Sequence, residues 1–334
     1  MLSAGCVAQT DPVSVAASLP VGDRPAKGAL DGERHRILVT TDLPADTDDI
    51  QSLIHLFLVA DLFDIEGIVT APPTFSRTRD FVQAHCGAAQ KTACIHRVID
   101  QYAFDYPHLR SWSPDYPSPA ALRALVKAGH ERPWESAGNA LTPGSRWIVE
   151  QALKADEDRP LYILAWGALT NTATALKHHP EIADRIRIFM VGWSNVNKDQ
   201  QAYDFVKQQF PQVFFVEAEG AMFGVRYPET GDGYNNDHLC DTIRHKGAMG
   251  KYWCRYRREY VDQDFVSVYY LMAGDASNPA GEHWGGRYRN VGGNRWKDIA
   301  DPGFRMNIPD VGLSDGVKTS SQWRKPRLDH LMQM

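Results

Sequence analysis

Four aspartates crowd one short stretch of the sequence, at Asp42, Asp46, Asp48 and Asp49. Carboxylates this close repel one another unless a positive charge holds them together, and oxygen ligands of this kind select Ca²⁺ or Mg²⁺. The stretch is therefore interpreted as a divalent-cation site. The alternative is an exposed acidic turn in which Asp48 or Asp49 only caps the helix that follows.

Two other chemistries that rely on an acidic or phosphate-binding loop do not fit the spacing. The sequence contains no GxxxxGK[ST] phosphate-binding loop. The nucleophile motif of haloacid-dehalogenase-like phosphatases needs a second aspartate two residues after the first, and Pro44 stands there. The sequence therefore argues against a phosphate-binding loop and against this type of phosphatase.

The segments around the acidic stretch predict the elements that position it. Residues 36–41 form a short β-rich run, and residues 64–70 form another that ends before Pro72. Between them, apolar residues recur from Ile50 to Leu58 at the spacing of one helix face. A strand, helix and strand in this order open a parallel sheet, and Asp42 lies where the first strand delivers its carboxyl end, the ligand-binding edge of such sheets.

The rest of the chain repeats this alternation. Further strands are predicted at residues 161–166, 186–191 and 213–216. Helices are predicted at residues 120–127, across residues 173–176 and at residues 203–209. The pattern favours an α/β fold with a mostly parallel central sheet flanked by helices. Residues 279–303 are rich in Gly, Pro, Trp and Arg and are predicted to form long loops.

The composition limits the partners. Of the 334 residues 43% are hydrophobic and 23% charged, and the net charge is −5. Without a basic stripe the chain lacks the signature of a nucleic-acid binder, so a small-molecule partner is expected. No apolar run reaches the roughly 18 residues of a membrane span. Residues 1–34 are interpreted as a leader or disordered tail, and residues 35–334 as a single domain.

The cysteines bear on the compartment. The start of the chain resembles the end of a bacterial lipoprotein signal with Cys6 as its lipidated residue, so an exported, periplasmic or lipid-anchored protein with a truncated leader is expected. The missing basic and apolar regions leave a cytoplasmic protein as the alternative. Cys86 with Cys94 and Cys240 with Cys254 could form two local disulfides, or all four could be unpaired thiols.

The acidic stretch also carries a family resemblance. Residues 41–49, TDLPADTDD, resemble the aspartate signature of calcium-dependent inosine/uridine nucleoside hydrolases lengthened by two residues, and residues 63–69 follow as FDIEGIV. The similarity continues at residues 116–119, 144–145, 159–161, 166–172, 247–250 and 284–288. The chain is thus similar to a nucleoside hydrolase-like family with an exported bacterial branch sometimes labelled cellulose-binding.

The resemblance implies a calcium-dependent hydrolase that cleaves the N-glycosidic bond of a ribonucleoside, with Mg²⁺ as the second candidate ion. It implies Asp42 as general base and metal ligand and Asp49 as a second ligand. Asp48 would bind a ribose hydroxyl. The main-chain carbonyl of Trp166 and the late carboxylate of Asp264 would complete the metal site. The alternative function is a carbohydrate-binding or carbohydrate-processing module with the same fold and altered or lost nucleosidase activity.

Several roles stay open at this point. Asp46 could replace Asp42 as base, and Asp264 could merely cap the following helix. Asn195 is the candidate for a further substrate contact, whereas Asn171 is expected to brace a turn. Gln263 stands where related enzymes have a histidine that supports the leaving base. The substrate is expected to be a nucleoside or glycoside, and a homo-oligomer is left open.

Overall fold

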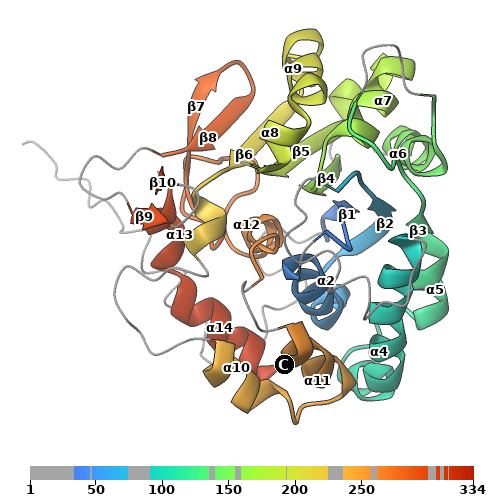
Figure 1. The fold of residues 1–334 in the computed structure, drawn as a ribbon, viewed down its shortest axis with the longest axis vertical. Helices are drawn as coiled ribbons and strands as arrows, with labels where there is room; N and C mark the ends of the chain where they lie inside the picture. Colours follow the sequence, from blue (N-terminus) through green and yellow to red (C-terminus); the bar gives the residue numbers. More distant parts are fainter. Residues whose placement is uncertain are drawn as a thin grey trace, which may run out of the picture.

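An eight-stranded sheet with helices on both faces forms the centre of the computed structural model (Figure 1). The structure describes residues 34–45, 47–73, 91–134, 140–154, 159–192, 194–224, 236–256, 262–299, 306–308, 312–314 and 316–334. Three residues singled out in the sequence, Cys6, Asp46 and Cys86, lie outside these ranges.

The strands of the large sheet run in the order β3-β2-β1-β4-β5-β6-β8-β7, parallel throughout except that β7 is antiparallel to β8. They span β1 Arg36–Thr41, β2 Asp64–Thr70, β3 Val126–Lys127, β4 Leu161–Trp166, β5 Ile186–Val191, β6 Phe214–Ala218, β7 Tyr288–Gly292 and β8 Arg295–Asp298. A second, two-stranded sheet pairs β9 Met306–Ile308 with β10 Gly312–Ser314.

The helices cover the two faces of the sheet and one end of the molecule. They are α2 Asp48–Leu58, α4 Lys91–Trp112, α5 Pro119–Leu125, α6 Pro143–Leu153, α7 Thr170–His178, α8 Ser194–Lys198, α9 Gln200–Gln209, α10 Asn236–Ile243, α11 Ala248–Trp253, α12 Val266–Met272, α13 Val317–Ser321 and α14 Arg324–Gln333. Short 3₁₀ turns span η1 Ala60–Leu62, η2 Pro180–Arg185, η3 Ala221–Gly224 and η4 Cys254–Tyr256. Among the described helices, including the 22-residue α4, none is long and apolar enough to cross a membrane.

Two hydrophobic cores lie on opposite faces of the sheet, because successive side chains of a strand point to opposite sides. In β1, Ile37 and Val39 enter one core and Leu38 enters the other. The first core packs the sheet against α2, α4, α10, α11, α12 and α14, and the second packs it against α6, α7 and α9 (Figure 1). Because the described central strands are covered on both faces, they appear in the sequence as continuous apolar runs.

The order of the strands reverses at β1, which lies between β2 and β4. The strands are in register at their carboxyl ends, with Thr41 of β1 opposite both Thr70 of β2 and Trp166 of β4. Ligands of open α/β sheets bind at such a reversal, beyond the carboxyl ends of the strands. The residues that follow Thr41, Thr70 and Trp166 are therefore brought together at this edge.

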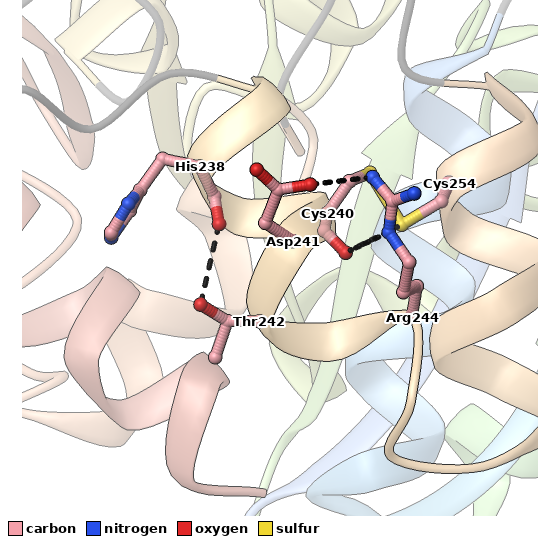
Figure 2. The surroundings of a disulfide bond; sticks show 6 residues. All are labelled: His238, Cys240, Asp241, Thr242, Arg244 and Cys254. Atoms are coloured by element: carbon pink, nitrogen blue, oxygen red, sulfur yellow. Dashed lines mark hydrogen bonds and ion pairs between the residues drawn. A yellow bond between two sulfur atoms is a disulfide. The ribbon is translucent and has the colours of Figure 1, made fainter.

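One disulfide joins two neighbouring helical segments. Cys240 of α10 is bonded to Cys254 of η4 (Figure 2). Arg244 bridges the same region, donating to the Cys240 carbonyl at 2.8 Å and to the Asp241 carboxylate at 2.7 Å. The predicted local pair is confirmed here, and the alternative of free thiols is wrong for these two residues. Cys94 is disulfide-bonded as well.

The sequence prediction was correct for β1, β2, β4, β5 and helix α2, and two predictions need correction. The helix predicted to reach Lys127 ends at Leu125, because Val126–Lys127 pairs with β2 as the edge strand β3. The region 279–303 was predicted to be loops, yet β7 and β8 form a hairpin in it. Its turn uses Gly292 and Gly293 at φ of 119° and 57°, conformations that glycine adopts readily.

Candidate metal centre

Three buried carboxylates meet beside the carboxyl edge of the sheet. Asp48 and Asp49 lie in the first turn of α2, and Asp264 directly precedes Phe265, the residue before α12. One carboxylate oxygen from each of the three lies within 4.8 Å of the other two, and all three residues are buried. Helix α2 and the turn before α12 thus deliver, from segments far apart in the sequence, the oxygen-rich donor set that a divalent cation requires.

The electrostatics of this group call for a positive charge. Burial raises the pKa of Asp49 well above its ordinary value, and the charges of Asp42, Asp264 and Asp48 raise it further, while the hydrogen bond from the Thr41 hydroxyl opposes the rise. The Oδ1 atom of Asp48 is buried and has no hydrogen-bond partner among the described residues. A buried acceptor without a partner is costly, so the site fits a cation that the three carboxylates would share.

The alternative of an exposed acidic turn is wrong for these residues. Asp48 and Asp49 are 7% and 1% exposed, and Thr47, the residue before helix α2, makes no side-chain capping bond. Neither Asp48 nor Asp49 occupies the N-cap position of α2, which belongs to Thr47. Their burial distinguishes them from the acidic residues common in solvent-exposed first turns.

Asp42 lies at the end of β1 and is buried. Its charge acts on Asp49, although the group of three mutually close carboxylates consists of Asp48, Asp49 and Asp264. Gly167, the residue after β4, lets the two strand ends approach: a Cβ atom on it would stand 2.8 Å from the Cβ of Asp42 and 3.1 Å from the Asp42 nitrogen. No pattern in the sequence indicated this role of Gly167.

Trp166 connects the end of β4 to the segment that carries Asp264. Its indole Nε1 donates to the Ser267 hydroxyl at 2.8 Å, and that hydroxyl donates to the Asp264 carbonyl at 2.8 Å. The side chain of Trp166 is 1% exposed, as expected for a core aromatic at a strand end. Its main-chain carbonyl stays a predicted metal ligand.

A lysine that the sequence analysis missed lies near the same edge. Lys91, the first residue of α4, donates from Nζ to the carbonyl of Ala71, the residue that follows β2. Partial burial lowers the pKa of Lys91, and the charges of Asp42 and Glu131 offset part of that effect. No pattern in the sequence indicated Lys91, because it belongs to a helix of weak amphipathic character that starts far from the acidic stretch.

The two candidate asparagines differ. Asn171 is buried and braces a turn as expected, accepting from the His130 amide and donating to the Thr70 carbonyl, both at 2.9 Å. Asn195, in α8, is 6% exposed and donates from its amide to the Val191 carbonyl at 2.9 Å. Its location after β5 is compatible with a substrate contact, and that role stays a prediction.

Comparison with known proteins agrees with this architecture. Residues 36–288, more than half of the chain, match the family model described as "Cellulose-binding Sde182, nucleoside hydrolase-like domain". No curated protein matches the chain.

Among solved structures, a nucleoside hydrolase-related hypothetical protein from Saccharophagus degradans, associated with carbohydrate metabolism, aligns with a TM-score of 0.70 and 19% identity over 90% of this chain and 71% of its own. The inosine-uridine preferring nucleoside hydrolase of Bacillus anthracis aligns with a TM-score of 0.49 and 14% identity over 89% and 99%. A plant nucleoside hydrolase aligns with a TM-score of 0.48 and 14% identity, over 88% of this chain and 99% of its own. The expected fold class is confirmed, and the chain belongs to the Sde182 nucleoside hydrolase-like family.

Proposed function

We propose that this protein is a calcium-dependent hydrolase that cleaves an N-glycosidic bond, with a ribonucleoside or a related glycoside as substrate. The observation that carries the proposal is the buried group of Asp48, Asp49 and Asp264, in which one carboxylate oxygen of Asp48 has no partner among the described residues. Such an arrangement is expensive for a protein to maintain without a ligand. Its place at the reversal of strand order is where this kind of sheet binds small molecules.

The proposed roles of the residues are those that the family resemblance implies, and the positions of Asp48, Asp49 and Asp264 support them. Asp49 and Asp264 would hold the cation together with Asp42 or Asp48 and the Trp166 carbonyl. A bound divalent cation would make a nearby water more acidic and hold vicinal hydroxyls. Asp42 would accept the proton of the attacking water as general base, because it follows β1 directly at the carboxyl edge of the sheet. Asp48 would orient a sugar hydroxyl.

Departure of the leaving base is the weak point of this chemistry. Gln263 adjoins Asp264, is 4% exposed, and its amide nitrogen has no hydrogen-bond partner among the described residues. An amide can donate a hydrogen bond to a leaving base but cannot release a proton. A positioned acid contributes roughly 10² to 10⁴ in rate, so substrates whose leaving group needs no proton should react far better.

Steady-state rates test this directly. With Ca²⁺ present, p-nitrophenyl riboside should be hydrolysed at least about 10²-fold faster than inosine or uridine, the lower end of the contribution of an acid. Chelation of Ca²⁺ should abolish all three rates, as should Asp49→Asn. Comparable rates on the three substrates would show that another residue supplies the acid. No turnover of any of them would refute the hydrolase.

A second function is favoured by the description of the family. The description of the matching family includes the term "cellulose-binding". The structural relative from Saccharophagus degradans is associated with carbohydrate metabolism. The corresponding proposal is a carbohydrate-binding or carbohydrate-processing module. Binding of cello-oligosaccharides in the absence of riboside turnover would establish this function over the first.

Export is proposed on the evidence of the disulfide. The bond between Cys240 and Cys254 is of a kind that forms and persists in oxidising compartments. Alkylation of protein recovered from the producing cells, without reductant and followed by mass spectrometry, should leave this pair unmodified. Alkylation of both thiols in periplasmic protein would contradict the proposal.

A further inference from the structure

We infer that Asp262 locks the segment carrying Asp264 onto helix α2 and thereby sets the spacing of the three carboxylates. Asp48 and Asp49 come from α2, whereas Asp264 comes from a turn more than 200 residues later in the chain. Some contact must hold these two segments in register if their oxygens are to share one ion. The inference rests on the proposed metal role, and it assigns to Asp262 and His55 a positioning role.

Two hydrogen bonds connect Asp262 to α2. Its carboxylate Oδ2 lies 2.6 Å from Nδ1 of His55, and its backbone amide donates to Oε1 of Gln51 at 3.1 Å. Both the main chain and the side chain of one residue are therefore held by the helix. Because Asp262 is only two residues from Asp264, a shift at one is transmitted to the other.

The helix presents these partners on the face that carries a metal-site carboxylate. Residues three, four and seven positions apart lie on one side of a helix, which places Asp48, Gln51 and His55 along one stripe of α2. Gln51 and His55 of this stripe are the two α2 residues whose hydrogen bonds reach Asp262. The stripe thus connects the metal site to the contact of Asp262 with Gln51 and His55, which is called the interlock below.

The interlock is sealed from solvent. His55 and Asp262 are both 0% exposed, and the His55 ring stacks on Phe265 with ring centroids 3.7 Å apart and planes inclined by 4°. Removing one partner of such a buried hydrogen-bonded pair leaves the other unsatisfied, which is destabilising. The segment therefore has one preferred position on α2.

The backbone of Asp262 supports the same role. Its φ is 50°, in the left-handed region, where aspartate is among the better-tolerated residues other than glycine. Asp262→Gly consequently removes the carboxylate without straining the chain. This substitution separates the side-chain contact from the turn geometry.

The test measures Ca²⁺ affinity by calorimetry on chelated full-length protein. Asp262→Gly and His55→Leu should each weaken Ca²⁺ binding by about tenfold or more, the size of effects seen when support around metal ligands is lost. His55→Asn, which keeps a polar atom near the Nδ1 position, should recover most of the affinity. If Asp262→Gly does not fold, Gln51→Leu removes only the hydrogen bond from the Asp262 amide. It should weaken Ca²⁺ binding by a smaller factor than His55→Leu does.

His283 provides the matched control. It is equally buried and stacks on Tyr270 with centroids 4.1 Å apart, and its ring nitrogens contact the Tyr270 and Asn278 carbonyls. His283→Leu should lower stability yet leave Ca²⁺ affinity unchanged within about twofold. An equal loss of affinity in His283→Leu would show a general effect of destabilisation and overturn the inference.

Hydrogen exchange in chelator gives a readout that does not depend on the ion. The amides of Val266 and Ser267 donate to the carbonyls of Gln263 and Asp264, both at 3.2 Å. His55→Leu should speed exchange at these amides, and His283→Leu should not. If wild-type protein binds no Ca²⁺, the proposed metal role fails while exchange still decides the interlock. Unchanged exchange, or wild-type affinity in Asp262→Gly, would overturn the interlock.

Discussion

Asp49 is the residue whose state depends most on what occupies the candidate metal centre. It is buried among three other carboxylates, and its pKa is raised by burial first and by these neighbours second. In calcium-free protein the folded state therefore binds more protons at Asp49 than the unfolded state does. The stability contributed by Asp49 is complete at low pH and is lost as the pH rises above 3.8, the ordinary value.

Asp49→Asn should stabilise the calcium-free protein at pH 7, because a neutral amide needs neither a proton nor a counter-charge in this buried position and keeps an oxygen for the Thr41 hydroxyl. A gain of about 1 kcal/mol would raise Tm by roughly 2 °C in a chain of this size. The variant should lose the Tm increase that Ca²⁺ produces by binding the folded state. Thermal melts with chelator and with Ca²⁺ measure both effects.

Asp199→Asn is the control for that substitution. Asp199 is also buried, and it accepts from the Trp134 amide at 2.9 Å and the Thr170 hydroxyl at 2.7 Å. It lies outside the group of mutually close carboxylates, so its variant should keep the full calcium-induced increase in Tm. A calcium response that survives Asp49→Asn would contradict the assignment of Asp49.

Gly167→Ala should disturb the centre without touching a carboxylate. The added Cβ would stand 2.8 Å from the Cβ of Asp42, an atom tied to the backbone and unable to move aside. Overpacking of this kind costs about 1–3 kcal/mol, and displacement of Asp42 should reduce hydrolysis. Urea unfolding and riboside turnover measure the two effects.

Gly192 holds the corresponding place after β5 and serves as the comparison. A Cβ on it would meet the Cγ atom of Glu219 at 3.0 Å, and that flexible side chain can move. Gly192→Ala should therefore cost less stability than Gly167→Ala and leave Ca²⁺ binding intact. Equal losses for the two variants would argue against a specific contact between Gly167 and Asp42.

At the residue scale, the sequence located Asp42, Asp48, Asp49 and Asp264 as candidates because carboxylates beside predicted apolar elements are chemically conspicuous. It could not locate Gly167, whose importance comes from the approach of a neighbouring strand. The pairing of His55 with Asp262 could not be predicted from the sequence either. Contacts between segments so far apart in sequence depend on the packing of the whole sheet and leave no local pattern.

At the scale of elements, helix α11 shows how one helix anchors another. The amides of Ala248 and Met249 donate to the two carboxylate oxygens of Asp105, on α4, both at 2.8 Å. Gly247 precedes the helix at φ of 123°, and a Cβ there would collide with the Asp105 carboxylate. A carboxylate from α4 thus satisfies the open amides at the start of α11.

Asp105→Ala should destabilise the protein by about 1 kcal/mol, the usual cost of losing a helix cap. Asp100→Ala, on the same helix, is the control: Asp100 pairs with Arg123, and both side chains are more than one-third exposed. Such surface pairs contribute roughly 0–1 kcal/mol. Chemical denaturation compares the two, and a larger loss for Asp100→Ala would contradict the capping role.

The elements that the sequence failed to predict have physical explanations. Helix α4 contains Pro107, a residue that ordinarily marks a break, and its polar residues obscure any apolar stripe. The hairpin of β7 and β8 lies at the sheet edge, and four of the five residues of β7 are exposed. An edge strand needs no continuous apolar run, so the region 279–303 resembled loops. The buried strands were predictable because both their faces are covered.

For the whole molecule, we propose that the fold holds a divalent cation at the reversal of strand order. The sheet brings Asp42 and the neighbouring strand ends to this edge, and α2 and the segment before α12 add the other carboxylates. Neither segment alone offers a complete donor set. The site is therefore a property of the assembled fold.

A crystal structure of the protein grown with Ca²⁺, with anomalous scattering recorded, is the direct test of this cation site. An anomalous peak should lie among the carboxylates of Asp49 and Asp264 and at least one of Asp42 and Asp48. Its oxygen ligands should stand at about 2.3–2.6 Å. The Trp166 carbonyl should be one of them. Well-ordered carboxylates with no peak between them at saturating Ca²⁺ would contradict the account.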